Sequence, residues 1–299
     1  KILIGTRASK LAMIYANRAK NEIGKVFSGE IEIVKITTDG DKNQKDRLSE
    51  IGGKGLFSKK IEEELIDKNI DIAVHSLKDM PSEETLGLIT NCFLKRNAPE
   101  EILITKENKK FSELNSNAII GTSSFRREFQ LKRIRNDLNY KTIRGNIDTR
   151  ISKINNKDYD GIILAKAGIK SLNLDHLISQ EFSTQEIIPS AGQGIVSIQC
   201  REDDTEVINI LNKVNDKISN ISAQAERKVL KILEGDCHTA VGVFSKLNND
   251  DFEISGELFS LDGKQRFFKI IKDKISNFLK VSIELGNYLK RESKDSYKK

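Results

Sequence analysis

Short apolar runs alternate with segments of helical periodicity through the first two thirds of this chain. Residues 2–5 form an apolar run that ends at a turn, and the apolar residues of 11–23 then recur at helical spacing. A second cycle begins after Pro99, with strands predicted at 102–105, 119–121 and 161–165. Alternation of this kind predicts βαβ units and largely parallel sheets. We therefore expect an α/β fold in which two units share one plan.

A third unit of different plan is predicted near Ser219. A helical segment over 223–233 is followed by three strand-like segments and a second helical segment over 275–289. This order predicts a small α+β domain with three antiparallel strands, and we expect the last ten residues, 290–299, to be frayed. A strand predicted at 195–199 is placed to return to the first sheet. The length of 299 residues suits two or three domains.

Composition excludes several classes of protein. Charged residues make up 31% of the chain and apolar residues 37%, and no apolar run approaches the ~18 residues of a membrane span. The three cysteines are widely spaced, which is typical of a reducing compartment and argues against disulfides or a CxxC metal site. Three scattered histidines argue against zinc, so no metal is expected. We expect a cytoplasmic protein, although a chain that begins at Lys1 leaves open a removed organelle-targeting segment.

Arginine is concentrated in one short window. The chain has 14 arginines, and six of them fall within residues 122–150, where the net charge is +5. Because the guanidinium pairs with carboxylate or phosphate in a bidentate way, this window favours a polyanionic ligand. Nucleic acid is the competing interpretation. The window holds only three aromatic residues, Phe125, Phe129 and Tyr140, which is few for a nucleic-acid surface.

Three small polar turns stand between a predicted strand and a predicted helix. They are residues 5–9, residues 121–124 and residues 144–146. At such turns, backbone N–H groups and hydroxyls point in one direction and can bind an anion. An N-cap serine beside solvated arginines is the alternative for any single turn, and the threefold recurrence favours anion binding.

Two further segments carry possible chemistry. Asp79 and Lys78 follow a buried strand, where α/β sheets bind ligands, so Asp79 is a candidate partner for a cationic intermediate; the alternative is a turn residue before Pro81. Cys237 sits in a turn beside His238, which would favour its thiolate, and the alternative is an inert cysteine.

The Gly-rich residues 52–55 fail the P-loop pattern, and no GxGxxG follows the first strand, so ATP and NAD are disfavoured.

These segments together resemble the porphobilinogen deaminase (hydroxymethylbilane synthase) family along nearly the whole chain. The matching stretches are Gly5-Thr6-Arg7-Ala8-Ser9, Gly53-Lys54-Gly55-Leu56-Phe57, residues 71–81, residues 121–127, Arg144-Gly145-Asn146, Ala191-Gly192-Gln193-Gly194 and Leu233-Glu234-Gly235. Each stretch alone is weak evidence for the resemblance, but the occurrence of all of them in this order is very specific to the family.

The resemblance implies an architecture and a reaction. It implies two lobes like those of periplasmic binding proteins, formed by 1–95 plus 195–215 and by 99–190, and a cofactor-attachment domain at 217–299. It implies a transferase of tetrapyrrole (haem) biosynthesis that deaminates four porphobilinogen molecules and joins them head to tail on a covalent dipyrromethane primer. Hydrolysis would then release hydroxymethylbilane. A monomer without nucleic-acid or membrane partners is expected. The alternative is a two-lobed binding protein for a small polycarboxylate, without catalysis.

The resemblance also assigns residues. Asp79 would be the catalytic carboxylate, and Cys237 would hold the dipyrromethane through a thioether. Asp79 is also expected to bind the cofactor, together with Arg7, Ser9, Lys78, Thr122, Ser123, Ser124, Arg126, Arg127, Arg144 and Gly145. Those expected to bind substrate are Arg7, Ser9, Lys54, Phe57, Ser76, Arg144, Arg150 and Gln193.

The sequence departs from the family pattern at two positions. Asp236 stands where the family has glycine before the attachment cysteine, and Ser171 stands where it has a basic residue. The adjacent Lys170 is a candidate substitute for that basic residue. These departures bear on ligand affinity and on the late additions more than on the reaction itself.

Overall fold

The computed structural model describes residues 1–38, 55, 58–156, 158–235 and 239–298. Within these residues the strands form three sheets, two of five strands and one of three. The chain divides into two compact units, and the first comprises residues 1–44, 53–97 and 194–224. The second unit comprises residues 45–52, 98–193 and 225–299, and each unit is described below by itself.

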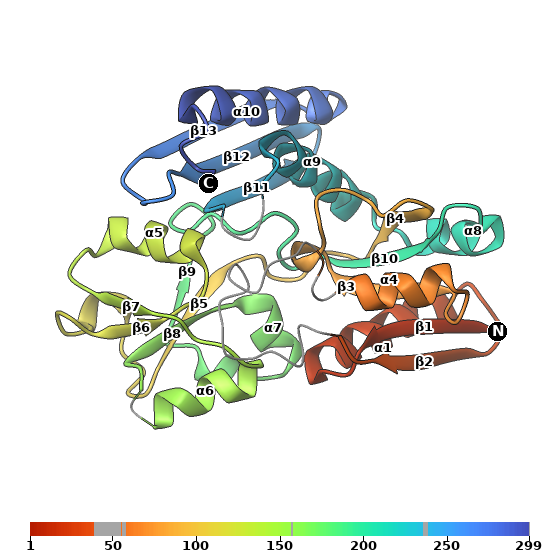
Figure 1. The fold of residues 1–299 in the computed structure, drawn as a ribbon, viewed down its shortest axis with the longest axis horizontal. Coiled ribbons are helices and arrows are strands. Elements are labelled where there is room, and N and C mark those ends of the chain that lie inside the picture. The colour runs from red at the N-terminus through yellow and green to blue at the C-terminus, as the bar shows by residue number, and fades with distance from the viewer. Residues whose placement is uncertain (39–54, 56–57, 157, 236–238, 299) are drawn as a thin grey trace. The chain divides into compact units, whose positions relative to one another are not determined.

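The first unit holds a five-stranded sheet between helices (Figure 1). Its strand order is β2-β1-β3-β10-β4; β1 is parallel to β2 and β3, whereas β10 is antiparallel to β3 and β4. Helices α1 and α8 share one hydrophobic core with the sheet, and α4 packs in a second core with residues of β1, β2, β3 and β4. The elements are β1 (Ile2–Arg7), α1 (Lys10–Gly24), β2 (Ile31–Ile36), α4 (Lys59–Ile66), β3 (Ile72–Ser76), β4 (Leu88–Phe93), β10 (Val196–Arg201) and α8 (Thr205–Val214).

The second unit contains a sheet of the same plan. Its order is β7-β6-β8-β5-β9, with β6 parallel to β7 and β8, and β5 antiparallel to β8 and β9. Leu131 of α5 packs in one core and Ile154 of α6 in another, on the two faces of this sheet. The elements are β5 (Glu101–Thr105), β6 (Ile119–Gly121), α5 (Phe125–Ile134), β7 (Asn139–Lys141), α6 (Ile147–Asn155), β8 (Gly161–Ala165), α7 (Lys166–Ser171) and β9 (Gln180–Phe182).

The C-terminal part of the second unit is a three-stranded antiparallel sheet with order β11-β12-β13. Helix α10 packs on β12 and β13. The prediction of a frayed tail was wrong, because α10 continues to Ser293 and Tyr297 is only 1% exposed, with its hydroxyl donating to the carbonyl of Leu233. One buried aromatic ring therefore anchors an otherwise polar tail. Helix α9 (Lys217–Leu233) begins in the first unit and enters the second at Ala225. The other elements are β11 (Val241–Asn248), β12 (Asp251–Phe259), β13 (Arg266–Lys274) and α10 (Phe278–Ser293).

The predicted fold class is confirmed, with two mostly parallel α/β sheets and a small antiparallel α+β portion. The return of the strand near 195–199 to the first sheet is confirmed as β10. The boundaries proposed for three separate domains stay a prediction. Among the described residues, no helix is long and apolar enough to cross a membrane.

Candidate functional site

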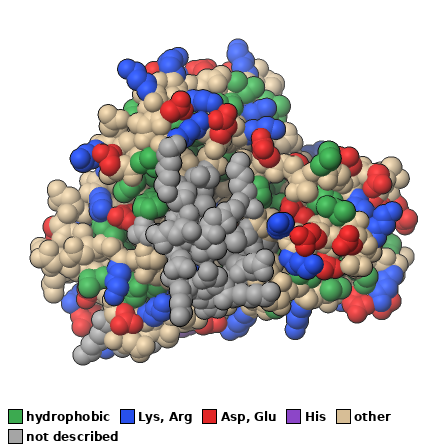
Figure 2. Space-filling model, in the orientation of Figure 1, with side chains coloured by type: hydrophobic (Ala, Val, Ile, Leu, Met, Phe, Trp, Pro, Cys, Tyr) green, Lys and Arg blue, Asp and Glu red, His purple; other side chains and the backbone are tan. Residues whose placement is uncertain are grey.

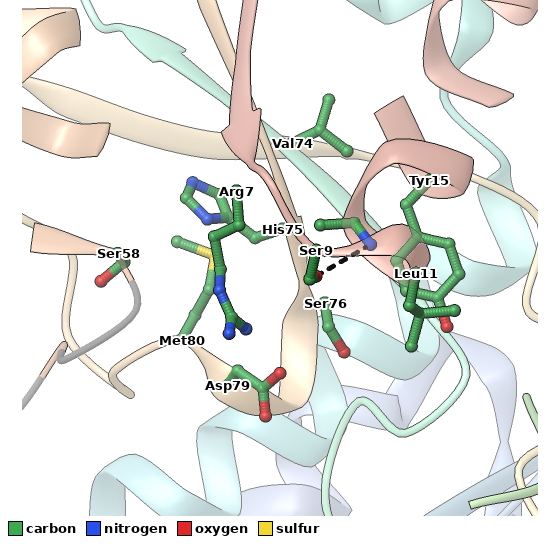
Figure 3. Close-up of a pocket in the computed structure, with 11 residues that line it drawn as sticks. Arg7, Ser9, Leu11, Tyr15, Ser58, Val74, His75, Ser76, Asp79 and Met80 are labelled. Carbon is green, nitrogen blue, oxygen red and sulfur yellow. Dashed lines mark hydrogen bonds between the residues drawn. The ribbon is translucent and has the colours of Figure 1, made fainter. Parts of the chain in front are cut away.

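A pocket in the first unit opens where β1 and β3 end, as the rule for α/β sheets predicts (Figure 3). Arg7 is the last residue of β1, and Ser76 is the last residue of β3. Three predicted site residues besides Arg7, namely Ser9, Ser76 and Asp79, therefore meet at one place. The lining residues are Arg7, Ser9, Leu11, Ala12, Tyr15, Ser58, Val74, His75, Ser76, Asp79 and Met80.

Ser9 begins helix α1 on one side of the pocket. Its Oγ accepts a hydrogen bond from the backbone N–H of Ala12 at 3.4 Å, which is the N-cap arrangement (Figure 3). This bond satisfies one of the free N–H groups of the first turn. The pocket therefore borders a helix N-terminus, whose partial positive charge favours an anion.

Asp79 lies on the opposite side of the pocket, in a short 3-10 turn over Leu77–Asp79. The turn follows β3 directly, and its buried Leu77 fixes it against the core. Asp79 itself is exposed, and Lys78 is partly buried. In Figure 3 the Arg7 side chain extends along the pocket towards Asp79. A cation and an anion therefore line the same pocket.

His75 forms part of the pocket wall and is 8% exposed. Burial lowers the pKa of His75 from 6.5 to about 4; the Gln199 side chain opposes this shift, and the charge of Arg7 adds to it. Its Nε2 is buried and makes no hydrogen bond of normal geometry with a described residue. His75 is therefore a neutral polar group at neutral pH.

In the second unit, the turn after β6 leads into helix α5. Ser124 is the N-cap of α5, and its Oγ accepts from the N–H of Arg127 at 3.4 Å. The Thr122 hydroxyl accepts from the N–H of Ser124, and Ser123 Oγ accepts from the N–H of Ile143. The three hydroxyls therefore order this turn.

Arg126 and Arg127 occupy the first turn of α5 and are buried. The Nη2 atoms of Arg126 and Arg127 lie 2.6 Å and 2.8 Å from the two carboxylate oxygens of Glu101, which is fully buried at the start of β5. Glu101 is not among the site residues predicted from the sequence. These two arginines are part of a buried ion cluster, not a solvated basic face.

The second turn of this unit, between β7 and α6, carries Arg144 and Gly145, and Arg150 follows in the first turn of α6. Arg144 is buried, and Arg150 Nε donates to the carbonyl of Gly145 at 2.8 Å. Gly145 has φ +108°, and a Cβ there would lie 2.8 Å from the Thr149 side chain, so only glycine fits. Lys153 Nζ donates to the carbonyl of Arg144 at 3.2 Å, which further fixes the turn.

Some of the remaining predicted residues are described by the structure, and others are not. Gln193 is fully buried, and its Nε2 donates to the carbonyl of Pro99 at 2.7 Å. Ser171 Oγ donates to the carbonyl of Ala167, and Lys170 is exposed. Lys54, Phe57, Asp236 and Cys237 lie outside the described residues.

Two family models cover most of this chain. The porphobilinogen deaminase dipyrromethane cofactor-binding domain matches residues 2–209, and the porphobilinogen deaminase C-terminal domain matches residues 221–293. The chain belongs to the porphobilinogen deaminase family. It is 41% identical over 294 residues to the porphobilinogen deaminase of Caldicellulosiruptor saccharolyticus, covering 97% of this chain and 99% of the relative. The porphobilinogen deaminase of Alkaliphilus metalliredigens is 38% identical over 289 residues, covering 96% of this chain and 92% of the relative.

Solved structures of similar fold include the periplasmic VFT2 domain of BvgS from Bordetella pertussis. It is 12% identical, with a TM-score of 0.45, and covers 76% of this chain and 91% of that domain. A likeness at this level carries no argument about function, so the family assignment depends on the sequence relatives.

Membership of the porphobilinogen deaminase family confirms the main functional prediction over the non-catalytic binding protein. The chain is an enzyme of this type, a transferase of porphyrin biosynthesis, and its cofactor is dipyrromethane. The roles of individual residues are not tested by these likenesses and stay predictions.

Two residues beside the predicted ones, His75 at the pocket and Glu101 at the arginine pair, were not predicted from the sequence. His75 extends the apolar strand 70–74 by one position, and its place just before Ser76 was the available signal. Glu101 follows Pro99-Glu100 at the start of a buried strand, and a charged residue there signals a buried partner. Nothing local in the sequence shows that the partner is an arginine pair on α5.

The described arginines of residues 122–150 do not form a continuous basic surface. Arg126, Arg127 and Arg144 are buried, whereas Arg135 pairs with Asp137. On the face drawn in Figure 2, Lys and Arg side chains are interspersed with Asp and Glu side chains.

Proposed function

We propose that this chain deaminates porphobilinogen at the pocket of Arg7 and Asp79, joins four such units head to tail and releases hydroxymethylbilane. The observation that carries the proposal is the meeting of Arg7, Ser9, Ser76 and Asp79 at the carboxyl ends of β1 and β3. Porphobilinogen bears two carboxylates and an ammonium group, and this pocket offers cationic, hydroxyl and carboxylate groups.

Asp79 is proposed to stabilise positive charge in the chemical step. When the carbon–nitrogen bond of the substrate breaks, its electron pair leaves with ammonia, and a delocalised cation remains on the pyrrole. A fixed carboxylate stabilises this cation more than the starting molecule, which lowers the barrier. The neutral His75 adds no competing positive charge to the pocket wall.

Arg7, Ser9, Ser76 and Lys78 are proposed to bind substrate or cofactor carboxylates beside Asp79. Arg7 provides a guanidinium fork, and Ser9 adds a hydroxyl at the N-terminus of α1. In the second unit, the same role is proposed for Arg126, Arg127, Arg144 and Arg150, together with the turn residues Thr122, Ser123, Ser124 and Gly145. Lys54, Phe57 and Gln193 complete the proposed substrate-binding set.

The residues of the second unit fit a ligand with several carboxylates. Arg127 Nε is a buried donor without a hydrogen-bond partner among the described residues, and two arginines share the single carboxylate of Glu101. We propose Cys237 as the thioether attachment residue. When bound, the dipyrromethane supplies the free pyrrole end to which the first substrate is joined.

The enzyme is further proposed to act as a monomer in the cytoplasm, with porphobilinogen as its only required partner. Gel filtration coupled to light scattering at micromolar concentration should give one species near the chain mass of 33.7 kDa. A concentration-dependent dimer would contradict this part of the proposal.

Intact mass spectrometry of the purified protein tests the cofactor assignment. The wild-type protein should carry a dipyrromethane adduct that maps to Cys237, and Cys237→Ala should lack both adduct and turnover. Cys92→Ala and Cys200→Ala are matched controls, because both thiols are buried and burial raises their pKa to about 12 and about 11. Turnover by Cys237→Ala, or loss of the adduct in a control, would contradict the assignment.

A further inference from the structure

Glu101 is the carboxylate that binds both arginines in the first turn of α5. Its side chain is fully buried; Oε1 accepts from Arg126 Nη2 at 2.6 Å, and Oε2 lies 2.8 Å from Arg127 Nη2. One carboxylate therefore divides its two oxygens between two guanidiniums. It does not form a bidentate pair with either.

The same guanidiniums are held on their other side by backbone carbonyls. Arg126 Nη1 donates to the carbonyl of Ile188 at 2.9 Å, and Arg127 Nη1 donates to that of Ile163, in β8, at 3.3 Å. Each guanidinium is therefore fixed at two points, one of which is Glu101. Such fixing sets the direction of the remaining donors before any ligand arrives.

Among the residues that the structure describes, this cluster holds more positive than negative charge. Arg126 and Arg127 bring two positive charges against one from Glu101, and their side chains are 5% and 9% exposed. The next buried carboxylate, Glu257, also acts on Arg126, but it pairs with Arg133 and Arg266, so its single charge is offset by two further arginines. A buried surplus charge is costly unless an anion compensates it.

One donor of the cluster also has no acceptor. Arg127 Nε is buried and has no hydrogen-bond partner among the described residues. Burial lowers the pKa of the Arg126 guanidinium, the neighbouring Arg127 acts in the same direction, and Glu101 opposes both effects. A ligand carboxylate supplies the two features that the cluster lacks, a negative charge and a hydrogen-bond acceptor.

We propose that Glu101 is a positioning residue for cofactor binding, which holds the Arg126 and Arg127 guanidiniums so that Arg127 binds a carboxylate of the dipyrromethane. The inference depends on the proposed function, in which these arginines bind that cofactor. Glu101 does not touch the ligand, and its effect passes through Arg127.

The test measures how fast the cofactor-free protein acquires its cofactor from porphobilinogen, by intact mass at several times. Glu101→Gln keeps the side-chain shape but loses the charge and one acceptor. It should incorporate the cofactor roughly tenfold or more slowly, the loss expected for one charged hydrogen bond. Arg127→Lys should slow incorporation similarly. The double variant should be little slower than either single variant, because both changes remove one interaction.

Glu257→Gln is the matched control, since Glu257 is also buried and shared by two arginines of the same unit. It should lower the melting temperature as Glu101→Gln does, yet leave the incorporation rate within about twofold of wild type. If Glu101→Gln does not fold, Glu101→Asp decides, because it keeps the charge but cannot span both guanidiniums; it should also slow incorporation.

Suppose that the folded Glu101 variant acquires the cofactor at the wild-type rate, whereas Arg127→Lys acquires it slowly. This result would overturn the positioning role of Glu101 and leave the proposed function intact. Wild-type incorporation by Arg127→Lys would instead overturn the carboxylate-binding role of Arg127, and the positioning role with it. If the fold reduction of the incorporation rate in the double variant equals the product of the two single reductions, the two residues act independently. That result would also overturn the inference.

Discussion

At the scale of single residues, two substitutions of Asp79 test separately the contribution of its charge and that of its shape. Asp79→Asn keeps the shape and removes the charge, so stabilisation of the cation is lost and single-turnover ammonia release should fall by roughly 10²-fold or more. Asp79→Glu keeps the charge and moves it by one methylene, so it should retain more activity. Thermal melts of both variants should stay close to wild type, because Asp79 is exposed.

The result also decides between chemistry and a structural turn. Wild-type ammonia release by Asp79→Asn would remove this carboxylate from the mechanism. Unfolding of both variants would instead indicate that Asp79 serves the turn before Pro81.

His75 gives a second prediction at this scale, from its depressed pKa. The folded protein binds a proton at His75 only near pH 4, whereas an unfolded histidine binds one near pH 6.5. Between these values the unfolded state holds the extra proton, so the stability contributed by neutral His75 is lost as the pH falls from 6.5 to 4. The loss should approach about 3 kcal/mol.

Urea unfolding of wild type and His75→Asn at several pH values measures this effect. The variant should show a shallower loss of unfolding free energy between pH 6.5 and pH 4. His176→Asn is the control, because His176 is exposed and its replacement should leave the wild-type slope unchanged. Parallel curves for wild type and His75→Asn would contradict the prediction.

At the scale of secondary-structure elements, Glu226 of α9 ties three segments of the second unit together. It is fully buried; its Oε2 accepts from the N–H of Gly192, and its Oε1 accepts from both the N–H and the hydroxyl of Ser245 in β11. Glu226→Gln replaces one acceptor oxygen by a donor, which leaves a backbone N–H unsatisfied. We expect unfolding free energy to fall by roughly 2 kcal/mol or more, measured by urea denaturation.

Glu202→Gln is the control for this change, because Glu202 is exposed and the substitution is chemically the same. It should alter the unfolding free energy by less than about 0.5 kcal/mol. Equal effects of the two substitutions would show that the Glu226 contacts contribute nothing to stability.

Strands bounded by turn residues were predictable from local sequence. The bounds predicted for 119–121 and 161–165 match β6 and β8, since each apolar run ends at a small residue. Strand β9 was not predicted, because its three residues become a strand only through pairing with β5. Helix α8 was also missed, although Val207, Ile210 and Leu211 carry a helical signal.

The candidate site shows the same division between local and tertiary information. Arg7, Ser9 and Asp79 follow from the turn that ends a strand, so the sequence predicts them. The link between Glu101 and the arginine pair depends on the position of β5 within its sheet, next to β8. No spacing in the sequence encodes that contact.

At the scale of the whole molecule, the proposed chemistry belongs to one unit, whereas two of the three proposed carboxylate-binding turns belong to the other. Asp79 belongs to the first unit, whereas Arg144 and Arg150 belong to the second. Asp79 acts on the cation formed in every round, so its replacement should slow each addition by a similar factor. An arginine that binds a particular carboxylate of the growing chain should affect only the additions that place a carboxylate there.

Arg144→Lys and Arg150→Lys test this distinction, because lysine keeps the charge but loses the planar fork. Each should lose roughly 1–3 kcal/mol of binding per charged hydrogen bond removed, and enzyme-bound intermediates of one defined length should accumulate. Asp79→Glu should instead give a uniform delay without one dominant intermediate. Mass spectrometry of the quenched enzyme over a single round of synthesis distinguishes the two patterns. A uniform delay in the arginine variants would contradict carboxylate binding by these turns, because loss of one subsite cannot slow all additions equally.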